Sequence, residues 1–265
     1  MKINVPATTL FIGLIITIAY LGVQKIDRLT YTQEQSGGSE STTNTEQSHS
    51  IKSVEDSSIR DETTVQEETQ VQNQKIIIEG VPHIQQMPEL ARGCEVTSLA
   101  MILQYAGVSV DKMTLAEEIY TVPFRDQNGL YGNPNDGFVG DIYTFENSGY
   151  GVYHRPIADL AETYLPGRII DLTGNSMDSI YGMVGSGSPV WVIVNSRFTL
   201  LPDSEFENWN TQSGEVEITY REHSVVVVGY DEDSVYLAEE PYTSVSRSSF
   251  EAAWNQMGQQ AVTFQ

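Results

Sequence analysis

The chain contains a single cysteine, Cys94, and this limits what can hold a folded domain together. One cysteine permits no intramolecular disulfide and no cysteine-rich zinc site. A folded domain must therefore rest on hydrophobic burial, and 265 residues with 40% hydrophobic content suffice for one sizeable core. The formal net charge of −22 argues against a nucleic-acid partner, because phosphate recognition needs clustered lysines and arginines.

Cys94 lies where a loop is expected to turn into a helix. Pro88 and Gly93 disfavour an earlier helix start, and the apolar positions that follow have the spacing of a helix with one buried face: Val96, Leu99, Ala100, Leu103 and Ala106. Free backbone N–H groups and the positive end of the helix dipole favour a thiolate in the first turn. The position predicts a thiol with a pKa below about 8.5. The alternative is a buried cysteine that acts as a small hydrophobe.

The first 74 residues differ in composition from the rest. Residues 5–23 are apolar and uncharged, which predicts a signal-anchor or transmembrane segment within residues 1–30, favoured over a cleaved signal peptide. Residues 31–74 are rich in Ser, Thr, Glu and Gln without apolar periodicity, which predicts a disordered tether. The chain from residue 31 onward is therefore expected on the extracellular face of the membrane, or secreted if the segment is cleaved.

Residues 75–265 form the expected folded domain, with helical patterns first and strand patterns later. Helices are predicted from residue 94 to about 107, from an N-cap at Thr114 onward, and over 156–165, 176–184 and 249–254. Strands are predicted over 75–78, 190–194, 216–220, 223–230, 235–239 and 260–264, and residues 123–151 as a long ordered loop or short helix. This order predicts an α+β domain with two lobes, in which the cysteine helix packs on an antiparallel sheet.

A cysteine nucleophile needs a base, a group that orients the base and a donor for the oxyanion. His223 begins a predicted strand 129 residues after Cys94, close to the cysteine-to-histidine spacing of papain-like proteases. The alternative for His223 is an edge histidine bonded to backbone. Gln86 precedes Cys94 on the loop that leads into the cysteine helix, called the entering loop below. It could supply the oxyanion donor, with Gln85 as an equal candidate on chemistry alone.

The orienting group should come from the strand that follows His223. A carboxylate there can accept the Nδ1–H of His223 and fix its tautomer. Glu239 and Glu240 are the candidates, and adjacent strand residues point to opposite faces, so at most one of them can serve.

Three separated motifs resemble one family. They are GCEVTSLAM from Gly93, EHSVVVVGYD from Glu222 and FxxxWxxMGxQA from Phe250. Together they resemble the stand-alone secreted relatives of the double-glycine leader peptidases, which form the front domain of bacteriocin exporters. The resemblance covers residues 76–265 and implies a papain-like fold with Cys94 as nucleophile, His223 as base and Gln86 as oxyanion donor.

The chain departs from this family at the third catalytic position. The family has an aspartate followed directly by proline, whereas this chain reads Ala238-Glu239-Glu240-Pro241. Matching the hairpin puts Glu239 at the aspartate position, and matching the proline puts Glu240 there.

The leading hypothesis is an exported, membrane-tethered thiol peptidase that acts on a peptide or protein, is monomeric and uses no cofactor or metal. A second is a catalytically impaired module that binds peptides or cell-wall material in the same cleft. A third is acyl transfer or deamidation on the same residues. The sequence does not identify the substrate, because specificity depends on the shape of the cleft walls.

Overall fold

The computed structural model describes residues 75–238 and 243–265. The predictions for residues 1–30 and 31–74, and the side chains of Glu239 and Glu240, lie outside these ranges. Within the described ranges, every helix is too short or too polar to cross a membrane. This finding contradicts the predicted transmembrane helix.

The described residues include a sheet of seven strands, with neighbouring strands antiparallel. Its main path runs β10 (Thr243–Ser246), β9 (Ser234–Leu237), β8 (Glu222–Tyr230), β5 (Val190–Asn195), β11 (Ala261–Phe264) and β4 (Ile169–Asp171), and β1 (Ile76–Ile77) pairs with β8. The prediction of a central strand after residue 189 is confirmed, because β5 lies between β8 and β11 and is buried throughout. The predicted β8–β9 hairpin is confirmed as well.

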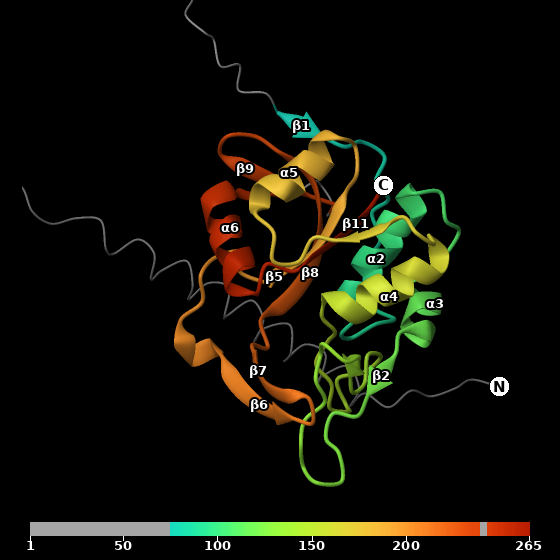
Figure 1. Ribbon diagram of the computed structural model, residues 1–265, viewed down its shortest axis with the longest axis vertical. Coiled ribbons are helices and arrows are strands. Elements are labelled where there is room, and N and C mark those ends of the chain that lie inside the picture. Colours follow the sequence, from blue (N-terminus) through green and yellow to red (C-terminus); the bar gives the residue numbers. More distant parts are fainter. Residues whose placement is uncertain (1–74, 239–242) are drawn as a thin grey trace, which may run out of the picture. The chain divides into compact units, whose positions relative to one another are not determined.

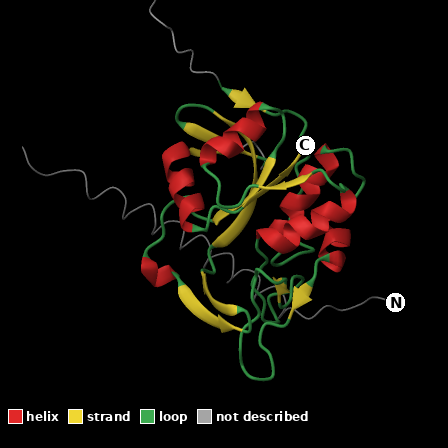
Figure 2. Cartoon of the chain, viewed as in Figure 1, coloured by secondary structure: helices red, strands yellow, loops and turns green. Residues whose placement is uncertain are grey.

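Helices cover both faces of this sheet (Figures 1 and 2). One face carries α2 (Cys94–Tyr105), α3 (Lys112–Glu118) and α4 (His154–Tyr164), and the other carries α5 (Met177–Gly185) and α6 (Arg247–Gln256). The predicted α+β class is confirmed, with the cysteine helix on the antiparallel sheet. The predicted N-cap at Thr114 is wrong. Asp111 is the N-cap of α3, and its carboxylate accepts the backbone N–H of Thr114.

The contact between α2 and the sheet fixes the end of the helix that carries Cys94. Trp191 of β5 donates its indole N–H to the Glu95 carbonyl at 2.9 Å, and the Ser98 hydroxyl donates to the Ser224 carbonyl of β8 at 3.2 Å. Both bonds are buried and join elements about 100 residues apart or more. They set the distance between the first turn of α2 and the start of β8.

Leu99 lies in the middle of this contact and is fully buried. Leu99→Ala is expected to lower the free energy of unfolding by about 2–5 kcal/mol, because it removes buried apolar surface and leaves a cavity. Chemical denaturation would measure the loss. Leu200, which is 61% exposed, supplies the control, and Leu200→Ala should change stability by less than about 0.5 kcal/mol. Equal losses for the two variants would show that α2 does not hold the domain together.

The described residues contain a second, smaller core. It is built on β2 (Thr121–Val122), β3 (Phe138–Val139), β6 (Glu207–Thr211) and β7 (Gly214–Ile218), and a 3-10 turn (Asp203–Glu205) leads into β6. Trp209 is its centre and stacks on Tyr131 with ring centroids 4.1 Å apart. The predicted ordered loop at 123–151 therefore contains strand β3 and packs on a β-ribbon, which local sequence did not indicate.

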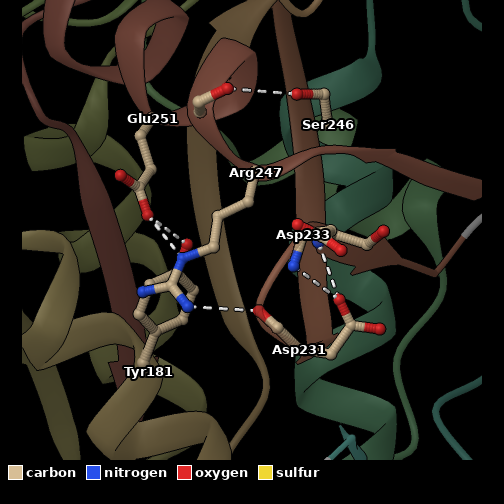
Figure 3. Close-up of polar contacts among 8 residues, drawn as sticks. Tyr181, Asp231, Asp233, Ser246, Arg247 and Glu251 are labelled. Carbon is tan, nitrogen blue, oxygen red and sulfur yellow. Dashed lines mark hydrogen bonds and ion pairs between the residues drawn. The ribbon is translucent and has the colours of Figure 1, made fainter. Parts of the chain in front are cut away.

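Arg247 fixes the other face of the sheet (Figure 3). Its guanidinium donates to the Glu251 carboxylate at 2.8 Å and to the Asp231 carbonyl at 3.1 Å, and it lies 4.3 Å from the centre of the Tyr181 ring. Tyr181 in turn donates its hydroxyl to Glu251. These contacts tie the start of α6 to α5 and to the β8–β9 turn, and so hold the strand that carries His223.

Candidate active site

Cys94 is the first residue of α2, as the sequence predicts. Gly93 is the N-cap residue and offers no side chain to cap the helix. A Cβ atom at position 93 would lie 2.6 Å from Cδ1 of Leu90, so the close approach of the entering loop requires glycine. The N–H groups of the first helical turn are thus left free of a side-chain cap beside the thiol.

Glu95, directly after the cysteine, is 1% exposed and holds the site together. One carboxylate oxygen accepts the backbone N–H of Val152 at 2.8 Å. The other accepts the S–H of Cys94 at 3.4 Å. This side chain connects the start of α2 to the segment that leads into α4.

Glu222, the first residue of β8, brings a second carboxyl to the same point. One atom each from Cys94, Glu95 and Glu222, the sulfur and two carboxyl oxygens, all lie within 4.8 Å of one another. The Oε1 atom of Glu222 is buried and has no hydrogen-bond partner in the described residues. The backbone of Gly151 packs against both acids, since a Cβ there would lie 2.4 Å from Glu95 and 3.1 Å from Glu222.

Burial of these carboxyls favours their protonated forms. It raises the pKa of Glu95 to about 7, against the opposing effect of hydrogen bonds from backbone groups and Cys94 and of the His223 charge. Burial, and then the charge of Glu95, raise the pKa of Glu222 well above its usual range. Two buried carboxyls this close cannot both ionise cheaply, so the pair holds a proton near neutral pH.

The thiol is affected in the same direction. Burial raises the pKa of Cys94 well above its ordinary value, and the charges of Glu95 and Glu222 raise it further. The predicted lowering of this pKa therefore has the wrong sign in this structure. The helix end favours a thiolate, but burial and the charges of Glu95 and Glu222 raise the thiol pKa by more than the helix end lowers it.

Gln86 lies beside Cys94, and both residues line the same two cavities. Its side-chain amide donates to the carbonyls of Leu90 at 3.0 Å and Ala91 at 3.1 Å. Both amide hydrogens are therefore engaged within the entering loop. To donate to an oxyanion, the amide must exchange at least one of these bonds for the substrate.

His223 follows Glu222 in β8. Its ring centroid lies 6.2 Å from that of Phe198, and its charge acts on the Glu95 carboxylate that accepts the Cys94 S–H. The structure thus brings Cys94 and Gln86 together at one cleft and places His223 one strand position from a carboxyl that lies next to the sulfur. Its predicted role as base stays a prediction.

Two cavities meet at Cys94 and Gln86. The first, of about 380 Å³, lies between α2, β8 and the entering loop. The second, of about 390 Å³, is bordered by Arg92, Phe145, Tyr150, Tyr220 and Glu222. Arg92 donates to the carbonyls of Asp141 and Thr144 and so holds the loop that carries Phe145. A peptide bound along the cleft would cross both cavities, with the Cys94 sulfur at the point where they meet.

Sequence reasoning missed Glu95 and Glu222. Each is next to a predicted catalytic residue, and both occur in the motifs quoted above, so the signal was present but was assigned only to their neighbours. The thiol and two carboxyls also have the donor types and spacing to hold a divalent cation. This group combines residues from two segments that lie far apart in the sequence, so no local spacing of ligands indicates it.

The fold and the cleft define a class of protein. Residues 78–262 match the model of the Peptidase_C39-like family, so the chain belongs to that family. The resemblance inferred from the three motifs is confirmed, and so is the C39-like fold.

Two relatives show how close the likeness is. The uncharacterized protein YvpB of Bacillus subtilis (strain 168) is 52% identical over 182 residues, which are 67% of this chain and 71% of YvpB. A crystal structure described as a "putative C39-like peptidase" from Bacillus anthracis shares 54% identity with a TM-score of 0.71, covering 72% of this chain and 98% of that one.

Proposed function

We propose that the protein is a thiol peptidase in which Cys94 is the nucleophile, His223 the base and Gln86 the oxyanion donor. Glu239 is the proposed third member, with Glu240 as the alternative. The observation that carries the proposal is the position of Cys94: the sulfur lies at the N-terminus of α2, beside the start of β8, where two cavities meet. Membership of a peptidase-like family supports the same conclusion.

The proposed reaction starts from a neutral thiol. His223 takes the Cys94 proton as the sulfur attacks the carbonyl carbon of the peptide bond, and the carbonyl π electrons move to oxygen. The Cys94 backbone N–H and the Gln86 amide stabilise this oxyanion. The C–N bond then breaks, the amine leaves with the proton from His223, and water cleaves the thioester to release the acid and restore the thiol.

The raised pKa of Cys94 supports one version of this mechanism. A thiolate paired with an imidazolium in the resting protein would face two carboxyls that disfavour negative charge on sulfur. Proton transfer during attack avoids this cost, because charge leaves the sulfur as the new bond forms. Rotation of Gln86 away from Leu90 and Ala91 would then accompany substrate binding.

A cleavage profile of the full chain on a diverse peptide library tests the proposal. Hydrolysis should appear as products whose masses add up to the peptide plus one water. Products that carry an added amine, or a glutamine converted to glutamate without chain cleavage, would instead support acyl transfer or deamidation.

Matching the hairpin of the family motif favours Glu239 over Glu240 as the third member, and adjacent strand residues point to opposite faces, so only one of the two can orient His223. Glu239→Gln is therefore expected to lower kcat much more than Glu240→Gln, because it removes the acceptor that orients the imidazole. Steady-state kinetics on one peptide would measure both variants, and the reverse ranking would place Glu240 in the triad.

The second candidate, a binding module that does not cleave, is favoured by two observations. The Cys94 pKa is raised, and the Gln86 amide is fully engaged within its own loop. Peptides that bind the full chain without being cleaved under any condition of pH or reductant would establish this candidate in place of the peptidase.

Export is a separate proposal, supported by the apolar segment at residues 5–23 and the polar segment that follows it. Residues 31–265 are expected outside the cytoplasm. Protease added to intact cells, or to the culture medium, should cut the chain between residues 31 and 74 while a cytoplasmic marker stays whole. Cleavage only after lysis would contradict export.

A further inference from the structure

Exposed apolar side chains gather around Cys94. The large apolar side chains that are exposed in the described residues are six: Met87, Tyr120, Tyr143, Phe145, Leu200 and Tyr220. Met87 borders the first of the two cavities that meet at Cys94, and Phe145 and Tyr220 border the second. Single exposed apolar residues are ordinary, whereas a group of them at a cleft indicates a binding surface.

The two rings at the second cavity are accessible and yet held in place. Phe145 is 66% exposed and Tyr220 is 61% exposed, so most of each side chain is open to a ligand. The Tyr220 ring packs edge-on against Tyr150, with centroids 5.9 Å apart, and against Trp209 of the second core at 6.2 Å. The guanidinium carbon of Arg92 lies 4.9 Å from the centre of the Phe145 ring. Rings that are already positioned lose less conformational entropy when a ligand binds.

The polar side chains of this cavity are engaged with the protein itself. Gln86 donates to two carbonyls of the entering loop, and Arg92 donates to the carbonyls of Asp141 and Thr144. The Glu222 carboxyl lies beside the Cys94 sulfur. The exposed side-chain surface at this cavity that has no such engagement is therefore mainly that of the two rings.

We propose that the second cavity is a subsite for an aromatic side chain of a substrate residue beside the scissile bond. The inference rests on the proposed peptidase function, because it takes Cys94 as the point at which the substrate reacts. The cavity volume of about 390 Å³ lies within the range of ligand pockets. The substrate ring packs against Phe145 and Tyr220 in the offset or edge-on arrangements that aromatic pairs prefer.

Other side chains fit this cavity less well. An aliphatic side chain covers the same apolar surface but lacks the ring edge and face that attract other rings. A glutamate side chain would add a negative charge next to Glu95 and Glu222, and a lysine side chain would lose hydration beside the Arg92 cation. A neutral ring avoids both costs.

The test measures how well short peptides protect Cys94 from alkylation. Because Cys94 is the only cysteine, the rate of iodoacetamide addition to the full chain reports this site alone by mass spectrometry. The peptides are acetyl-Ala-X-Ala-Ala-amide with X as phenylalanine, cyclohexylalanine, alanine or glutamate. Cyclohexylalanine has nearly the size of phenylalanine but no aromatic ring.

The phenylalanine peptide is expected to halve the alkylation rate at a concentration at least about tenfold lower than the alanine peptide, because it buries a large apolar side chain. It should also act at a concentration about threefold lower than the cyclohexylalanine peptide, because of ring-to-ring attraction. The glutamate peptide should protect no better than the alanine peptide.

The variants Phe145→Leu and Tyr220→Leu keep an apolar side chain but remove a ring, so each should bring the phenylalanine-to-cyclohexylalanine ratio toward one. The matched control is Tyr120→Leu, because Tyr120 is 69% exposed and does not line either cavity at Cys94. It should leave the ratio unchanged. If Tyr220→Leu lowers the midpoint of thermal unfolding, Phe145→Leu alone decides the test.

Equal protection by phenylalanine and alanine would overturn the subsite, and equal protection by phenylalanine and cyclohexylalanine would show a general apolar cavity instead of an aromatic one. Strongest protection by the glutamate peptide would mean that Arg92 binds an acid there, and would overturn the proposal too. So would a ratio that Phe145→Leu leaves unchanged. The measurement does not depend on hydrolysis: selective protection without any cleavage would keep the subsite and overturn the peptidase, whereas cleavage without selectivity would overturn the subsite alone.

Discussion

Cys94→Ser is expected to abolish peptide hydrolysis, by at least about a thousandfold in kcat, while the domain stays folded. The serine hydroxyl is nearly the same size as the thiol but is a much weaker nucleophile without a base matched to it. The buried environment, which already disfavours charge on the sulfur, disfavours an alkoxide still more. Product release by mass spectrometry gives the rate, and the midpoint of thermal unfolding reports the fold.

The control is Ser186→Ala, which removes a hydroxyl at the end of α5 that bonds to the Gly182 carbonyl and is exposed to solvent. It should keep the activity of the unmodified chain. His223→Ala should resemble Cys94→Ser in activity and in stability. Turnover that survives Cys94→Ser would show that another group attacks the peptide, and would remove the central residue of the proposal.

The sequence predicts best those segments whose buried residues form a continuous run or a periodic pattern of apolar side chains. The run from Val190 to Val194 predicts a central strand because every residue is apolar, and β5 is buried along its whole length. The helix after Gly93 is predicted from apolar residues at helical spacing, and α2 begins at Cys94 as expected. The predicted cap, Thr114, lies inside α3 instead, because the carboxylate of Asp111, three residues earlier, accepts the Thr114 backbone N–H.

The site was predicted less completely than the fold, and the reason is electrostatic. A helix N-terminus stabilises a thiolate by a local effect that the sequence around Cys94 shows. The opposing effect needs Glu222, which is 128 positions away along the chain and reaches the sulfur only because β8 packs on α2. Such a contact has no local pattern.

Glu222→Gln should move the alkylation profile of Cys94 to lower pH, because the Glu222 charge is one cause of the raised thiol pKa. The amide keeps the size of the side chain but cannot ionise, so the thiolate no longer faces that charge. Burial and Glu95 remain, and the profile should still lie above that of a free thiol in a model peptide. The rate of iodoacetamide addition as a function of pH measures the shift.

Glu222→Gln is also expected to change how the free energy of unfolding depends on pH. The folded-state pKa of Glu222 is raised, so the folded protein holds this proton more tightly than the unfolded chain does. Its contribution to stability is fully present below the unfolded pKa of about 4.3 and is lost as pH rises from there toward the folded pKa. Glu222→Gln removes this dependence. The variant should gain stability relative to the unmodified chain as the pH rises above about 4.3, and it should lose that advantage in acid.

Glu215→Gln, on an exposed position of β7, is the matched control and should change neither the alkylation profile nor the pH dependence of unfolding. Denaturant unfolding at three or four pH values would separate the two variants. An alkylation profile that Glu222→Gln leaves in place would mean that burial alone governs the thiol. A profile that moves to higher pH would mean that Glu222 acts as an acceptor that assists ionisation of Cys94, and the carboxyl pair would then belong to the catalytic machinery as a base.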